Sequence, residues 1–163
     1  MNSSPSLGVF LVQAGVVIFG WYVVHRLAVA RDMDKARREM VAKAADSLVE
    51  NMTELLADIR DYHRLDRSAS LELKIKSSLQ DASMRIVGLN EVSDCRDAIS
   101  RCNRSLGGVR TASTMRHFED EHLGALKEDD PLFQDVAASI SRVKQDLLRL
   151  KYSQFPRKRG NNK

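Results

Sequence analysis

Residues 41–62 read VAKAADSLVENMTELLADIRDY, with apolar side chains recurring at intervals of four and three residues. This spacing places them on one face of an α-helix, while charged side chains such as Glu50, Glu54 and Asp58 fall off that face. The stripe predicts a helix that buries one side against other helices. Its members are Val41, Ala45, Leu48, Met52, Leu55, Ile59 and Tyr62.

A second stripe of similar length follows Asp130-Pro131. Aspartate is a favoured N-cap residue, and proline at the first helical position costs nothing because that N–H has no intrahelical acceptor. The two stripes predict an all-α fold, an antiparallel bundle of three to four helices over residues 31–156. The second stripe comprises Phe133, Val136, Ile140, Val143, Leu147 and Leu150.

Two further apolar stripes lie between them. A helix is expected to begin near Ser70, whose side chain would cap it. The phase of the pattern slips near residues 90–94, which indicates either a break capped by Ser93 or a stutter in a longer helix. Gly107-Gly108 is expected to end that helix, and residues 109–129 have no clear pattern. The stripes are Leu71, Ile75, Leu79, Ala82, Ile86 and Leu89, then Val92, Cys95, Ile99, Cys102 and Leu106.

The regular stripes have two interpretations. They close on one another within a single chain, or they offer coiled-coil seams to other subunits. We favour the intramolecular bundle and treat homo-oligomerisation as an addition to it. The seam contacts are then expected at Val41, Leu48, Met52, Leu55, Ile59, Phe133, Val136, Ile140, Val143, Leu147 and Leu150.

Upstream, residues 7–24 read LGVFLVQAGVVIFGWYVV, an apolar run broken only by Gln13. A helix of about 18 apolar residues is long enough to cross the hydrocarbon core of a bilayer. We therefore predict a single transmembrane helix and its boundary at residues 7–30, continuing into the bundle. The residues expected to anchor it in lipid are Leu7, Phe10, Leu11, Val16, Val17, Ile18, Phe19, Trp21, Tyr22 and Arg26.

Two alternatives to a membrane span exist. Ala28-Val29-Ala30 resembles a signal-peptidase site, but residues 1–6 carry no cation and His25-Arg26 interrupts the run before that site. A fully buried core helix is the other alternative, although so short a chain rarely hides a helix that is apolar all round. We therefore favour a membrane anchor over both a cleaved signal peptide and a buried core helix.

The cations around the run predict its orientation. Residues 1–6 have none, whereas residues 25–43 carry six cations and three anions. Lys and Arg beside a span are retained on the cytoplasmic side, so residues 1–6 are expected outside and the helical domain in the cytoplasm. Residues 44–156 carry 16 cations and 19 anions. This mildly acidic body gives no reason to expect nucleic-acid binding.

Four cations, Arg157, Lys158, Arg159 and Lys163, gather in residues 157–163, which are expected to form a disordered basic tail. A solvated tail, an anionic lipid surface and nucleic acid are its possible environments. The two cysteines suit a reducing compartment. Cys95 and Cys102 are seven residues apart, about 10.5 Å along one helix, which is too far for a disulfide.

The one constellation that suggests catalysis is His117, Glu121 and His122. His117 and Glu121 would face the same side of a helix and could reach one metal ion, but the spacing fits neither zinc-protease motif. A charged helix end is the simpler interpretation. With no phosphate loop or nucleophile elbow in the sequence, we expect neither a catalytic residue nor a bound metal, cofactor or small-molecule substrate.

Residues 20–39, GWYVVHRLAVARDMDKARRE, resemble a loosely defined group of small bacterial inner-membrane proteins with one N-terminal span and a basic juxtamembrane helix. The resemblance covers some 35 residues. It implies a bacterial host and a cytoplasmic helical domain, and it carries over no functional residue.

Three functions remain open from the sequence. The first is a non-enzymatic, membrane-anchored scaffold that recruits a cytoplasmic protein partner. The second is an oligomerising membrane effector of a defence or toxin system, whose bundle controls assembly of its membrane helices. The third is a membrane-associated metal-dependent enzyme using His117, Glu121 and His122.

Overall fold

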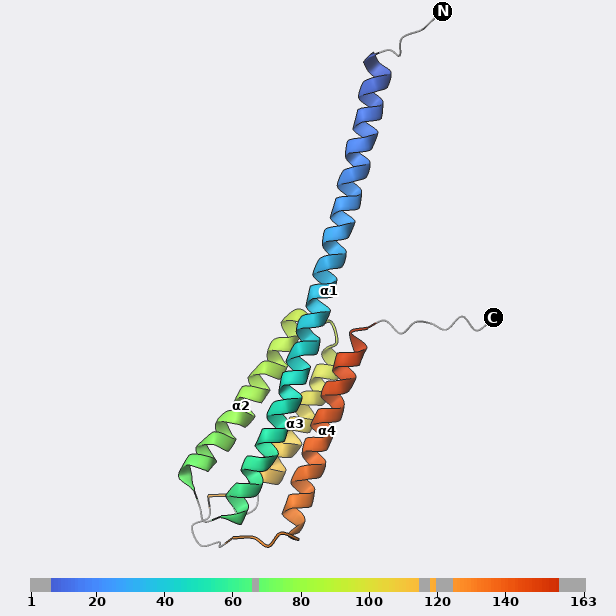
Figure 1. Cartoon of the computed structure of the whole chain (residues 1–163). Coiled ribbons are helices and arrows are strands. Elements are labelled where there is room, and N and C mark those ends of the chain that lie inside the picture. Colours follow the sequence, from blue (N-terminus) through green and yellow to red (C-terminus); the bar gives the residue numbers. More distant parts are fainter. Residues whose placement is uncertain (1–6, 66–67, 115–117, 120–124, 156–163) are drawn as a thin grey trace, which may run out of the picture. The chain divides into compact units, whose positions relative to one another are not determined.

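The computed structural model describes residues 7–65, 68–114, 118–119 and 125–155, without the side chains of residues 7–12 and 14. Four helices account for most of these residues, namely α1 Leu7–Arg64, α2 Ala69–Val92, α3 Arg96–Thr114 and α4 Pro131–Ser153 (Figure 1). The described residues contain no strand. The prediction of an all-α helical fold is confirmed.

The chain divides into two compact units, Met1–Arg37 and Arg38–Lys163. Helix α1 is assigned without interruption through the residues of both. The second unit contains the rest of α1 together with α2, α3 and α4, and the following paragraphs concern this unit alone.

Polar contacts between α1 and α2 give the direction of this helix pair. Arg85 donates to Ser47 Oγ at 2.9 Å, and Lys74 donates to Asp58 Oδ1 at 2.7 Å. Residue numbers fall along α2 as they rise along α1, so the two helices are antiparallel. Such an arrangement needs only a short connection, here residues 65–68.

Helix α4 is antiparallel to α1 for the same reason. Lys144 Nζ lies 2.8 Å from Thr53 Oγ1, and Lys151 Nζ lies 2.7 Å from both carboxylate oxygens of Asp46. The C-terminal end of α4 is therefore beside the part of α1 that begins the second unit, as the red and cyan ends of the bundle show in Figure 1.

Helix α3 completes the bundle by packing against both α2 and α4. Ser105 Oγ lies 2.6 Å from Asp146 Oδ2 on α4. The turn between α2 and α3 is held by Ser93, whose hydroxyl accepts a hydrogen bond from Cys95 N at 3.2 Å. Of the two alternatives for the phase slip near residues 90–94, the structure has the break.

The core is built from the apolar stripes. Every predicted seam position is buried, with an exposed fraction of 8 % or less. The stripes therefore close on one another within the chain. These residues are Val41, Leu48, Met52, Leu55, Ile59, Phe133, Val136, Ile140, Val143, Leu147 and Leu150, and the intervening stripes add Ile75, Leu79, Ala82, Ile86, Leu89, Ile99, Cys102 and Leu106.

Two details of the helix ends differ from the predictions. The N-cap of α2 is Ser68, whose hydroxyl accepts from Leu71 N, and Ser70 lies inside the helix. Gly107-Gly108 does not end α3, which runs on to Thr114. The burial of Val109 on the same stripe explains this, because packing outweighs the poor helix propensity of two exposed glycines.

Candidate membrane anchor and partner surface

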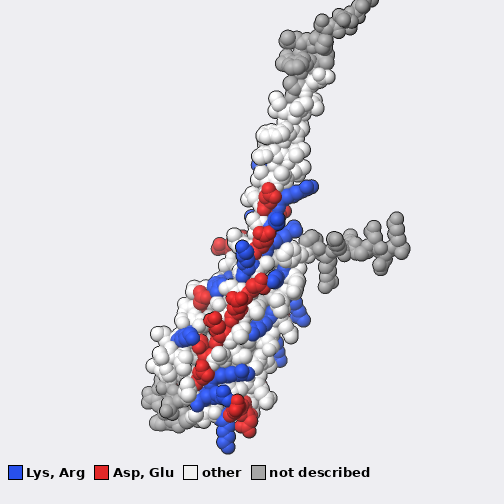
Figure 2. All heavy atoms as spheres, viewed as in Figure 1, with Lys and Arg blue, Asp and Glu red and all other residues white. Residues whose placement is uncertain are grey.

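The described side chains of the first unit, residue 13 and residues 15–37, are all exposed. Up to Val24 most of them are large and apolar, and Figure 2 shows this stretch as uncharged atoms. A helix that is apolar on every side has no face suited to water and needs a covering of lipid or protein. The exposed apolar residues are Val16, Val17, Ile18, Phe19, Trp21, Tyr22, Val23 and Val24.

Across the described residues, no helix has both the length and the apolar character that a membrane crossing requires. Three of the predicted anchor residues, Leu7, Phe10 and Leu11, have side chains outside the described set. The membrane span therefore stays a prediction.

Aromatic and basic side chains meet at the end of the apolar run. The rings of Trp21 and His25 are stacked with their centroids 5.3 Å apart. One residue further along, Arg26 Nε donates to the Tyr22 hydroxyl at 3.2 Å, and its guanidinium lies 5.8 Å from the centre of that ring. Aromatic rings and cations that combine an apolar body with a polar tip are typical of membrane–water boundaries.

Acidic side chains on α1 form a band along one face of the second unit, flanked by cations on both sides (Figure 2). Carboxylates one turn apart repel one another, so such a band needs nearby positive charge. Lys151 of α4 pairs with Asp46, and Lys74 of α2 pairs with Asp58. The hydrogen bond and the charge of Asp58 raise the pKa of Lys74 above its usual 10.5.

Helix α2 has an exposed apolar stripe opposite its buried one. Leu73 is 70 % exposed, Met84 60 % and Val87 48 %. At roughly 100° per residue, the three lie within an arc of about 60° on the outer face of the helix. Leu73 and Val87 are two heptads apart, the spacing by which one helix docks along another. The inner stripe alone is predicted from the sequence, although the spacing of Leu73, Met84 and Val87 is visible there as well.

A polar cluster, with Tyr62 and Glu72 buried and Lys76 and Glu119 half exposed, links the α3–α4 connection to α1 and α2. The Tyr62 hydroxyl donates to Glu72 Oε1 at 2.9 Å and accepts from Glu119 N at 3.1 Å. Lys76 pairs with Glu119 and lies 5.7 Å from the centre of the Phe118 ring. Glu72, in the first turn of α2, is buried. A groove of about 460 Å³ lies beside this cluster.

The two cysteines have different surroundings. Cys102 is buried in the core, and this burial, followed by the charge of Asp146, raises the pKa of its thiol to about 11. Cys95 is half-buried just before α3, where hydrogen bonds from Ser153 Oγ at 3.5 Å and Gln154 Nε2 at 3.3 Å lower its pKa below 9.0. Cys95 is therefore the more reactive thiol.

His117, Glu121 and His122 lie outside the described residues, as does the basic tail. Among the described residues, no three histidine, cysteine or acidic side chains lie close enough together to hold a metal ion. The structure thus neither assembles nor tests the metal constellation considered from the sequence.

No protein-family profile, curated protein or solved structure matches this chain. The resemblance of residues 20–39 to small bacterial inner-membrane proteins therefore stays a prediction.

Proposed function

We propose that this protein is a non-enzymatic scaffold, anchored in the bacterial inner membrane by residues 7–24, that recruits a protein partner through its cytoplasmic bundle. The observation that carries the proposal is the exposure of every described side chain of the apolar run, residue 13 and residues 15–24. Such a surface is unfavourable in water, at roughly 25 cal/mol for each Å² of apolar area. Lipid is the environment that covers all sides of a single helix.

The charges that follow the apolar run support its orientation. Residues 25–43 carry six cations against three anions, and the Trp21, Tyr22 and Arg26 side chains mark the boundary between them and the run. By the positive-inside rule, this charge asymmetry supports a cytoplasmic location for the bundle.

For recruitment, we assign the exposed stripe of Leu73, Met84 and Val87 on α2 as the partner surface. The seam residues are buried in the bundle's own core, so they are not accessible to another chain. The outer stripe of α2 extends over about 21 Å between Leu73 and Val87, which fits an amphipathic helix of a cytoplasmic partner.

Anchoring is tested by alkaline extraction of membranes from cells that produce the full chain. The wild type should stay in the membrane pellet. Val17→Lys combined with Ile18→Lys should be released, because each lysine near the centre of a span costs about 2.5–3.5 kcal/mol. Leu148→Lys, at an exposed apolar position of the bundle, is the matched control and should stay in the pellet. Wild-type protein in the soluble fraction would refute the anchor.

Recruitment is tested by affinity purification from gently solubilised membranes, with the full chain beside a version lacking residues 1–30. A specific cytoplasmic protein retained by both, and lost in Met84→Glu but not in Leu148→Glu, is the expected result. Self-association alone, lost together with residues 1–30, would instead favour the oligomerising membrane effector. A stoichiometric metal lost on replacing His117, Glu121 and His122 by alanine would favour the metal-dependent enzyme.

A further inference from the structure

The groove of about 460 Å³ is lined jointly by α2, α3 and the α3–α4 connection. Its volume falls within the range of about 300–1,000 Å³ that is usual for sites that bind small organic molecules. Because each of the three segments contributes to the lining, groups that are far apart in the sequence converge on one space. The lining includes Lys76, Leu79 and Gln80 of α2, Arg110 of α3, and Phe118 and Glu119 of the connection.

The apolar wall of the groove is held in place by the bundle. Leu79 belongs to the core and is 2 % exposed. The Phe118 ring packs against the Tyr62 ring, with 4.9 Å between the ring centroids. The backbone N–H of Glu119 donates to the Tyr62 hydroxyl at 3.1 Å, and the φ of Glu119, 66°, is uncommon for a residue other than glycine. These contacts fix the connection beside the groove, so ring and core side chain form a preformed apolar surface.

The charged side chains of the groove differ in whether they are already paired. Lys76 pairs with Glu119, so these two charges neutralise one another. Arg110 is exposed, and no described residue forms a hydrogen bond or an ion pair with its guanidinium. The groove therefore has one cation in excess. A guanidinium binds a carboxylate through two parallel hydrogen bonds, which makes an organic anion a better ligand here than a neutral molecule.

We propose that this groove binds a small organic anion with a flat apolar body, such as an aromatic carboxylate. The carboxylate of the ligand pairs with Arg110, and its ring packs against Phe118 and Leu79. An inorganic anion would leave the apolar wall uncovered, and a neutral aromatic molecule would leave the guanidinium unpaired. The site uses no residue of the apolar run and none of the exposed apolar stripe of α2, so the inference does not rest on the proposed function.

Isothermal titration tests the site with 2-naphthoate, and with 2-naphthamide as an uncharged probe of similar shape. The full chain is used in phosphatidylcholine nanodiscs, or in buffer alone if it is soluble, and empty discs correct for uptake by lipid. We expect the wild type to bind one equivalent of 2-naphthoate. It should bind 2-naphthamide at least tenfold more weakly, because a hydrogen bond to a charged group contributes roughly 10- to 100-fold in affinity.

Two pairs of variants locate the binding. Arg110→Gln should weaken 2-naphthoate binding at least tenfold, whereas Arg104→Gln, which removes another exposed cation of α3, should leave it unchanged. Gln80→Trp should block the groove without changing its charge, and Gln145→Trp, at an exposed position of α4, is the matched control. All four positions are exposed, so each variant should keep the fold.

The inference would be overturned if the wild type did not bind 2-naphthoate, or if it bound both probes equally well. Full affinity in either Arg110→Gln or Gln80→Trp would place the binding outside the groove. An equal loss in Arg104→Gln and Arg110→Gln would indicate a general attraction between the anion and surface cations, which also overturns the site. None of these results depends on whether the chain is extracted from membranes, so the failure of this inference is distinguishable from failure of the membrane anchor.

Discussion

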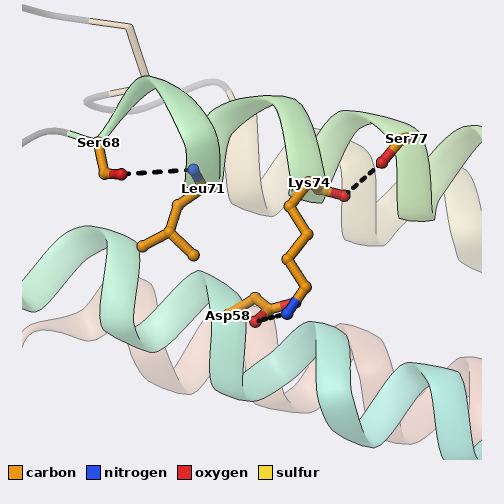
Figure 3. A network of polar contacts seen from close by, with 5 residues as sticks. All are labelled: Asp58, Ser68, Leu71, Lys74 and Ser77. Carbon is orange, nitrogen blue, oxygen red and sulfur yellow. Dashed lines mark hydrogen bonds and ion pairs between the residues drawn. The ribbon is translucent and has the colours of Figure 1, made fainter.

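Lys74 on α2 holds the carboxylate of Asp58 on α1, with 2.7 Å between Nζ and Oδ1 (Figure 3). Asp58 is 9 % exposed, whereas the lysine is largely in solvent. The same end of α2 is fixed by the Ser68 cap on Leu71 N. A carboxylate this far from water needs its cation, so the pair ties the two helices together.

The first prediction concerns the alkaline limit of stability. Asp58 raises the pKa of Lys74 in the folded chain. The ion pair therefore contributes its full stabilisation to the folded state below pH 10.5, and this contribution is lost as the pH rises through the folded-state pKa of Lys74. Lys74→Gln should be less stable than the wild type at neutral pH, and the difference should shrink above pH 10.5. Denaturant unfolding across this range, with Lys127→Gln as the surface control, measures it. A constant difference would contradict the pairing.

The second prediction concerns the two glycines inside α3. A Cβ at Gly107 or Gly108 meets no atom within 4 Å, and neither residue has a positive φ. Alanine should therefore stabilise the bundle by about 0.4–1 kcal/mol at each position. Denaturant unfolding of Gly107→Ala and Gly108→Ala measures this gain. Gly107→Pro is the opposing control and should destabilise by about 3 kcal/mol or more. A loss of stability in both alanine variants would mean that α3 ends earlier.

The apolar stripes were predictable because residues that share one face of a helix are buried together, so burial repeats with the period of the helix. Residues at intervals of three and four share one face of a helix. The apolar stripes from Val41 to Tyr62 and from Phe133 to Leu150 are removed from water only when they pack against other apolar helix faces. The N-cap of α4 was also predictable, because Asp130 and Pro131 are adjacent in the sequence. These features depend on residues close in sequence, so sequence patterns reveal them.

Features that depend on distant residues were not predictable. Whether Gly107-Gly108 ends a helix depends on the burial of Val109 by the rest of the bundle. Glu72 can be buried because the hydroxyl of Tyr62, on another helix, donates a hydrogen bond to its carboxylate. The outer stripe of α2 was missed because a helix with apolar residues on two faces has a weak one-sided pattern. The spacing of Leu73, Met84 and Val87 is visible in the sequence, whereas their exposure is shown by the structure.

The third prediction tests the cap of α4. The Asp130 carboxylate accepts from Leu132 N at 2.8 Å, in front of Pro131 at the first helical position. Asp130→Ala should cost about 1 kcal/mol, as N-cap removal typically does. Asp129→Ala removes the same charge one residue earlier and should have a smaller effect. Equal losses of unfolding free energy in the two variants would mean that charge, not the cap, stabilises this end.

The fourth prediction concerns thiol reactivity. The folded chain should react with one equivalent of iodoacetamide at Cys95, and the unfolded chain with two, because Cys102 is buried with a pKa of about 11. Ser153→Ala removes the hydrogen bond that contributes most to lowering the Cys95 pKa, so its alkylation should slow near neutral pH and its pH profile should move to higher pH. Ser141→Ala, on the same helix, is the control. Mass spectrometry of the alkylated peptides measures both rates, and an unchanged profile in Ser153→Ala would show that this hydroxyl does not stabilise the thiolate.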